Sequence, residues 1–159
     1  MDVTLTMTEW HHAAQTALLR MVVSAAQKLN HASTYERTWS ERMAEEMTGA
    51  AGEVAVAKVL GAFFVGSVNT FHRVPDCIAG TEVRATERDN GCLILRDNDP
   101  DDRRYVLVVG SAPKLRIAGW LVGADGKRPE FLRNPHGHRP AWFVPQDNLR
   151  PWAELTNGV

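Results

Sequence analysis

The feature that most constrains this chain is a change of hydrophobic period at Gly61. Before Gly61, apolar residues recur every three or four positions, which is typical of amphipathic helices. After it, short aliphatic and aromatic runs alternate with clusters of Gly, Pro, Asn and Asp, which is typical of strands and turns. Two helices followed by several strands predict an α/β (α+β) domain. A length of 159 residues corresponds to one domain.

Two helices are predicted before the change of period. The first covers residues 8–29, with Thr8 as its N-cap. Its alanine-rich face can pack on the core or form a homodimer contact, and both alternatives stay open. The second covers residues 40–60, is capped by Ser40 and ends at Gly61.

The remaining sequence predicts a mixed β-sheet flanked by these helices, with antiparallel hairpins for much of it. The predicted strands are residues 63–68, 77–79, 82–86, 92–96, 105–110, 117–123 and 141–144, and residues 134–140 form a surface loop. The single domain, 1–159, is therefore divided into an N-terminal helix (8–30), a second helix (40–60), a sheet core (63–123) and a C-terminal loop with the last strand (124–159).

Charge and composition narrow the class of protein. Residues 1–112 hold 11 Lys/Arg and 15 Asp/Glu, and residues 113–159 hold 7 and 4, so the two parts carry −4 and +3. This asymmetry suits a metal site beside a groove for a polyanion. No apolar run approaches the length of a membrane helix, and the N-terminus lacks the basic and apolar regions of a secretory signal. We therefore expect a cytoplasmic protein with both cysteines reduced.

The segment from Arg73 to Arg84 contains the most informative side chains. Glu82 and Arg84 lie two apart on a predicted strand and so share one face, while Val83 points into the core. If the preceding strand pairs around the Ala79–Gly80 turn, Asp76 converges with Glu82. Two hard oxygen ligands would then suit Mg²⁺, with a basic side chain beside them to steady a phosphate.

Pro75-Asp76, a five-residue spacer and Glu82-Val83-Arg84 resemble the motif of the PD-(D/E)XK nuclease superfamily, which includes restriction enzymes, phage exonucleases and resolvases. The resemblance covers about residues 45–110 and implies a restriction-endonuclease-like core. It also implies that Glu53, on the preceding helix, joins Asp76 and Glu82 as a ligand of Mg²⁺ or Mn²⁺. Asp76, Glu82 and Arg84 would be catalytic. The chain would be a DNA nuclease encoded by a phage or prophage, and it would act in the bacterial or phage-infected host cytoplasm.

Arg84 departs from the family's pattern, because it stands where the family's lysine is found. Arginine stays protonated and differs from lysine in shape, although it can clamp a phosphate with two hydrogen bonds. This favours an alternative in which the fold is kept but the chemistry is lost, leaving a DNA- or protein-binding phage accessory module. A third alternative is an α+β protein without a nucleic-acid role.

Basic residues outside the motif are candidates for nucleic-acid binding. They are Arg73, Lys114, Arg116, Lys127 and Arg128. Aromatic side chains near them, such as Trp120 and Trp142, could line the same groove, and the alternative is that they belong to the core.

Other patterns carry ordinary interpretations. The run Asp97–Asp102 lacks the glycine and the terminal glutamate of a calcium loop, which indicates a solvated acidic turn. The spacing of His136 and His138 relative to Cys77 and Cys92 matches no zinc motif. Cys77 is interpreted as a buried structural thiol.

Overall fold

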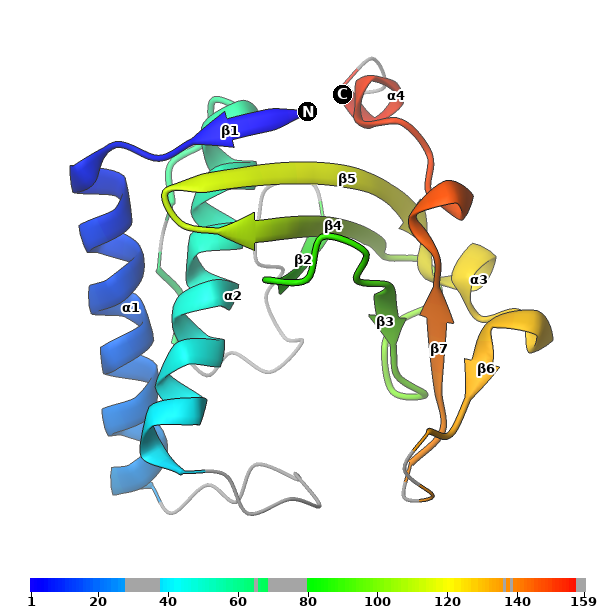
Figure 1. Ribbon diagram of the computed structural model, residues 1–159, viewed down its shortest axis with the longest axis horizontal. Helices are drawn as coiled ribbons and strands as arrows, with labels where there is room; N and C mark the ends of the chain where they lie inside the picture. Colours follow the sequence, from blue (N-terminus) through cyan, green and yellow to red (C-terminus); the bar gives the residue numbers. More distant parts are fainter. Residues whose placement is uncertain (28–37, 65, 69–79, 136, 138, 157–159) are drawn as a thin grey trace.

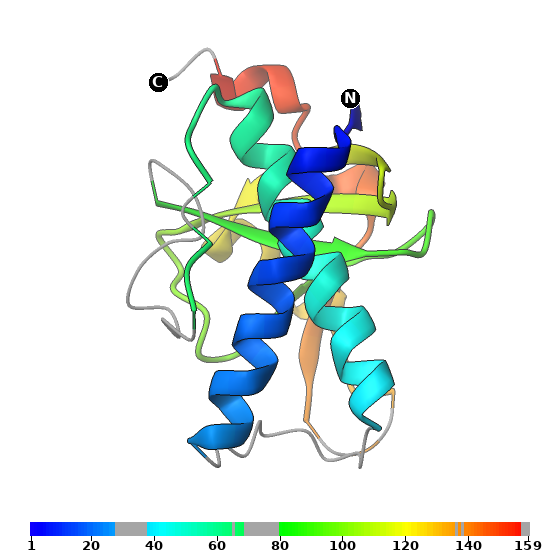
Figure 2. The ribbon, with the colours of Figure 1, turned by 90° about the vertical axis from the view of Figure 1, so that its left-hand side faces the viewer.

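A computed structural model describes residues 1–27, 38–64, 66–68, 80–135, 137 and 139–156. In this part of the chain, two long helices lie on one face of a four-stranded sheet, and a three-stranded sheet lies against the other face (Figures 1 and 2). The α-helices are α1 (Met7–Ala26), α2 (Trp39–Val59), α3 (Gly123–Gly126) and α4 (Trp152–Thr156). The strands are β1 (Asp2–Thr4), β2 (Thr81–Thr86), β3 (Leu93–Leu95), β4 (Arg104–Ser111), β5 (Lys114–Val122), β6 (Leu132–Arg133) and β7 (Ala141–Val144). The mixed α/β class is confirmed.

Both long helices begin with a capping box. The hydroxyl oxygens of Thr6 and Thr38 accept hydrogen bonds from the backbone N–H groups of Glu9 and Glu41, whose carboxylates accept from the threonine N–H groups in return. The observed N-caps, Thr6 and Thr38, therefore lie two residues before the predicted N-caps, Thr8 and Ser40. The Thr-x-x-Glu spacing at both sites is the sequence signal that identifies them.

Sheet A has the strand order β1-β5-β4-β2 and is mixed, as expected. β4 and β5 form the predicted antiparallel hairpin, but β2 pairs with β4 in parallel, so a simple succession of hairpins is not observed. The connection between β2 and β4 contributes β3 to sheet B, whose order is β3-β7-β6. β1 pairs with β5 and was not predicted from the sequence.

Successive side chains of β4 point to opposite faces of sheet A, and this explains why two hydrophobic cores form. Val106 and Val108 point to the side of α1 and α2, while Tyr105, Leu107 and Val109 point to sheet B. Each of these five side chains is almost fully buried, as expected for a strand covered on both faces. The prediction that the long helices flank the sheet therefore holds for one face of sheet A only, because sheet B covers the other face.

One predicted strand is not observed, and another lies outside the described residues. The described residues of the 63–68 segment form no strand, and the side chain of Phe63 is 87% exposed. The segment was predicted as a strand because it is rich in aromatic and aliphatic residues, but Gly66 adopts a left-handed conformation, with φ of +63°, that interrupts extended backbone. The predicted strand 77–79 lies outside the described residues.

The two glycines of α2 have different surroundings, and this permits a matched test. A Cβ on Gly52 would lie 2.8 Å from Cβ of Ala85 on β2, whereas a Cβ on Gly49 would meet nothing within 4 Å. Gly49→Ala should stabilise the protein by about 0.5–1 kcal/mol through helix propensity. Gly52→Ala should instead destabilise it by about 1–3 kcal/mol through overpacking. Urea unfolding measures both, and effects of the same sign would contradict the close packing of α2 on β2.

Candidate functional site on strand β2

Glu82 and Arg84 project from the same face of β2, as the sequence predicts. They lie beside Tyr105 and Leu107 of β4 and therefore face sheet B, whereas Val83 belongs to the core beneath the helices. Among the described residues, β2 pairs with β4 alone and is an edge strand of sheet A. The two motif side chains are thus held on a rigid element at the border of the sheet.

Glu82 is buried and lies between two guanidinium groups. Its residue is 3% exposed, and Nη1 of Arg103 donates a short hydrogen bond to Oε1. Nη1 of Arg84 lies 3.9 Å from Oε2. A carboxylate this deeply buried requires compensating charge, to which Arg103, the residue before β4, contributes. Arg103 is a site residue that the sequence analysis missed.

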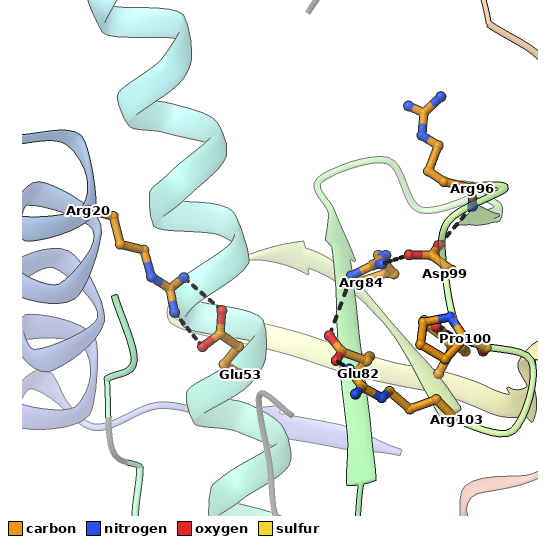
Figure 3. Close-up of polar contacts among 9 residues, drawn as sticks. Arg20, Glu53, Glu82, Arg84, Arg96, Asp99, Pro100 and Arg103 are labelled. Carbon is orange, nitrogen blue, oxygen red and sulfur yellow. Dashed lines mark hydrogen bonds and ion pairs between the residues drawn. The ribbon is translucent and has the colours of Figure 1, made fainter. Parts of the chain in front are cut away.

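Asp99 joins the same group of charges from the loop between β3 and β4 (Figure 3). Its Oδ1 accepts a 2.9 Å hydrogen bond from Nη2 of Arg84, and its Oδ2 accepts a 2.8 Å bond from the backbone N–H of Arg96. Glu82, Arg84, Asp99 and Arg103 are hereafter the β2 charge cluster. It contains two acidic and two basic side chains, and their formal charges cancel.

The predicted solvated acidic turn is wrong for Asp99. Asp97, Asp101 and Asp102 are exposed, but Asp99 is 3% exposed. The difference arises because a tertiary contact with Arg84, 15 positions earlier, turns this one carboxylate inward. No local pattern in the sequence distinguishes Asp99 from its three neighbours.

Tyr105 forms the floor of the cluster. The guanidinium carbon of Arg84 lies 5.4 Å from the centre of the Tyr105 ring, and the phenol hydroxyl donates a 3.2 Å hydrogen bond to the carbonyl of Pro100. Burial raises the pKa of Tyr105 well above its ordinary value, and the negative charge of Asp99 raises it further. The hydroxyl therefore remains protonated and continues to donate its bond near neutral pH.

Glu53 does not join the β2 charge cluster. Its residue is 6% exposed, and its carboxylate accepts hydrogen bonds of 2.7 and 2.8 Å from the two Nη atoms of Arg20 on α1. Its neighbour Gly52 packs on Val83 and Ala85, on the face of β2 opposite to Glu82 and Arg84. Glu53 is directed at Arg20 of α1, whereas Glu82 on β2 is directed at Arg84 and Arg103 (Figure 3), so a ligand set that includes both is not assembled here.

Asp76 and Arg73 lie outside the described residues, and their placement is therefore not described. The convergence of Asp76 with Glu82 stays a prediction. Gly80, directly before β2, has φ of +69°, the left-handed conformation that favours glycine and that turns often require.

Lys127, a predicted contact with nucleic acid, makes its described contacts within the protein. Its side chain is 14% exposed, and its ammonium donates to the carbonyls of Asp97 and Asp99 and pairs with the carboxylate of Asp101. These contacts hold the β3–β4 loop in place. Because the charge is used inside the protein, we assign Lys127 to the support of this loop.

The other predicted basic residues that the structure describes do not form one continuous basic surface. Lys114 begins β5, while Arg128 follows α3, beyond the far end of β5. Eight residue steps of roughly 3.3 Å place the two ends of this strand about 26 Å apart. Arg116 donates to the carbonyl of Asp89 and to Oε1 of Gln146, and so connects loops. Lys114 is exposed, and Arg128, whose side chain is 50% exposed, pairs with Glu130 at 3.3 Å and donates to the carbonyl of Asp125.

Trp120 belongs to the core, which was one of the two alternatives for this residue. It is 7% exposed, and its indole N–H donates a 3.1 Å hydrogen bond to the carbonyl of Pro151. It is therefore not a stacking surface for bases.

The donor chemistry around Glu82 is compatible with a hard divalent cation, but the described residues do not complete a site. Glu82 supplies carboxylate oxygens, which Mg²⁺ prefers. Within the described part of the chain, no group of three or more His, Cys, Asp or Glu side chains could hold a metal ion. A cation at Glu82 would therefore need a further ligand, and Asp76 is the residue that the sequence provides.

The chain has no significant match among models of protein families, curated proteins or solved structures. None of the helices in the described part combines the length and apolar character needed to cross a membrane.

Proposed function

We propose that this chain is a Mg²⁺- or Mn²⁺-dependent DNA nuclease of the PD-(D/E)XK type, with Glu82 as its central acidic residue. One observation carries the proposal. Glu82 and Arg84, the Glu-x-basic pair of the motif, project together from an edge strand and are held there by Arg103 and the buried Asp99. The Pro75-Asp76 pair lies directly upstream in the sequence, and the left-handed Gly80 before β2 suits a turn between the two.

Each residue of the site has a distinct task. Glu82 and Asp76 would hold the cation, and Arg103 fixes the Glu82 carboxylate from the side of β4. Arg84 would contact the phosphate undergoing cleavage, because its planar guanidinium matches phosphate oxygens in a bidentate manner. The bound cation would supply a water of lowered pKa and positive charge near the phosphate. Glu53 is left out of this ligand set because it is paired with Arg20 on the other side of β2.

Cleavage of DNA by the purified chain tests this function. Incubation of supercoiled plasmid and of single-stranded DNA with Mg²⁺ or Mn²⁺ should convert at least one substrate to shorter or nicked products, and EDTA should prevent the conversion. Intact DNA in every metal condition would contradict the nuclease proposal.

A second candidate is a binding module without catalysis, and the completeness of the β2 charge cluster favours it. In the cluster, Glu82 is engaged by Arg103, and Arg84 is engaged by Asp99. A site neutralised in this way could serve as a stable scaffold without a cation. DNA affinity, measured by fluorescence anisotropy, discriminates between the two. The module should bind equally well in EDTA and in Mg²⁺ and should leave the DNA intact.

A further inference from the structure

We propose that Asp99 is a positioning residue that fixes the guanidinium of Arg84 for contact with a DNA phosphate. The inference rests on the proposed function, because it assigns Arg84 a phosphate partner. It adds a residue that belongs to none of the motif positions and that comes from a separate loop, between β3 and β4.

Asp99 is fixed at both carboxylate oxygens and at its backbone. Oδ2 accepts from the N–H of Arg96, and the N–H of Asp99 donates back to the carbonyl of Arg96 at 3.1 Å. Lys127 donates to the carbonyl of Asp99 at 2.5 Å. Oδ1 is directed at β2 and accepts a hydrogen bond from Nη2 of Arg84. The loop therefore presents one carboxylate oxygen to Arg84 at a defined place.

The Arg84 side chain is held by two neighbouring residues and is still partly exposed to solvent. Its guanidinium lies over the Tyr105 ring and is bound by Asp99, yet 28% of the side chain remains exposed. By comparison, 18% of the Arg103 side chain and 1% of the Asp99 side chain are exposed. Arginine presents five N–H donors in a rigid fork. An anchor on one part of this fork sets the direction in which the other donors meet an anion.

A purely structural ion pair is the competing explanation. Buried ion pairs often contribute little net stability, and apolar residues can replace them at no cost. Stability therefore does not explain why Asp99 is a buried aspartate between exposed ones. A positioning role predicts an effect on DNA that depends on Arg84, whereas a structural role predicts an effect on folding alone.

The test is a double-mutant cycle between Asp99→Asn and Arg84→Gln, with Asp102→Asn as the matched control. Asp102 lies in the same loop and is exposed, so the control makes the same chemical change without the inward contact. The two donors meet different oxygens of Asp99, so an asparagine in the same position presents its oxygen to one of them and its NH₂ group, which cannot accept, to the other. Single-turnover cleavage at saturating DNA and the Kd for DNA in EDTA are measured for each protein.

Asp99→Asn should lower the cleavage rate about ten- to hundredfold, the usual effect of losing a supporting contact at a catalytic site. In the Arg84→Gln background, the same change should have little further effect, since Asp99 acts through Arg84. Equal rates for Asp99→Asn and wild type would overturn the proposal, as would an undiminished loss in the Arg84→Gln background. If Asp99→Asn does not fold, Asp99→Glu replaces it, because glutamate keeps the charge and displaces the carboxylate by one methylene.

The cycle also separates this proposal from the nuclease function. If the wild type binds DNA but cleaves none, the nuclease proposal fails, and the Kd values decide the role of Asp99. A coupling of threefold or more in Kd between positions 84 and 99 would support positioning, and additive effects would overturn it. A wild type that neither binds nor cleaves DNA would overturn both.

Discussion

Glu82→Gln should reduce Mg²⁺-dependent cleavage by about 10²- to 10³-fold. A catalytic cation contributes several kcal/mol of transition-state stabilisation, and each 1.4 kcal/mol corresponds to about tenfold in rate. Glutamine preserves the size of the side chain and an oxygen acceptor for Arg103, but it removes the charge that a divalent cation requires. Single-turnover cleavage of plasmid DNA measures the effect.

Glu87→Gln is the matched control, because Glu87 directly follows β2 and is exposed. It should cleave at the wild-type rate. Glu82→Gln leaves Arg103 without its full counter-charge, so its fold is checked by circular dichroism. Glu82→Asp, which keeps the charge and shortens the side chain, serves if the glutamine variant does not fold. Cleavage by a folded Glu82→Gln variant at the wild-type rate would remove Glu82 from the mechanism.

Arg20→Met should destabilise the protein by about 3–5 kcal/mol, the largest stability effect expected for the chain. The Arg20 and Glu53 side chains are 12% and 8% exposed, and the substitution leaves the Glu53 charge buried without its bidentate partner. The double variant Arg20→Met/Glu53→Leu should recover most of the loss, since apolar residues of similar volume often replace a buried pair without cost. Urea unfolding of the three proteins measures both effects.

The Arg20 cycle also examines the role of Glu53. A loss below about 1 kcal/mol for Arg20→Met would indicate a surface ion pair and would contradict a buried structural contact. Glu53 would then be available for the metal, as the family resemblance implies. A large loss with recovery in the double variant supports the assignment of Glu53 to the contact between α1 and α2.

Much of the architecture could be predicted because it depends on local periodicity. The apolar spacing before Gly61 located both long helices, and the aliphatic run at 105–110 located β4. It was harder to predict which residues of each helix face the core. Leu18 and Val22 fit the spacing of the core-facing residues, yet each is 50% exposed, because α1 packs through its smaller residues Ala13 and Ala17. Small side chains let two helices approach closely, and packing of the alanine-rich face on the core was one of the two alternatives for this helix.

Strand partners and the ion pairs of the site depend on distant residues, and the sequence did not reveal them. The same face for Glu82 and Arg84 follows from the period of a strand and was predicted correctly. Their partners Arg103 and Asp99 come from 21 and 15 positions away and are reached only because β2 and β4 run parallel. The contact of Glu53 with Arg20 requires the packing of α1 on α2, which no spacing in either helix indicates.

Titration of the protein with Mn²⁺ by isothermal calorimetry tests for a metal site at Glu82 without any knowledge of the DNA substrate. We expect binding by the wild type, loss of that binding in Glu82→Gln, and its retention in Glu53→Gln. No Mn²⁺ binding by the wild type, or equal binding by wild type and Glu82→Gln, would contradict a metal site at Glu82.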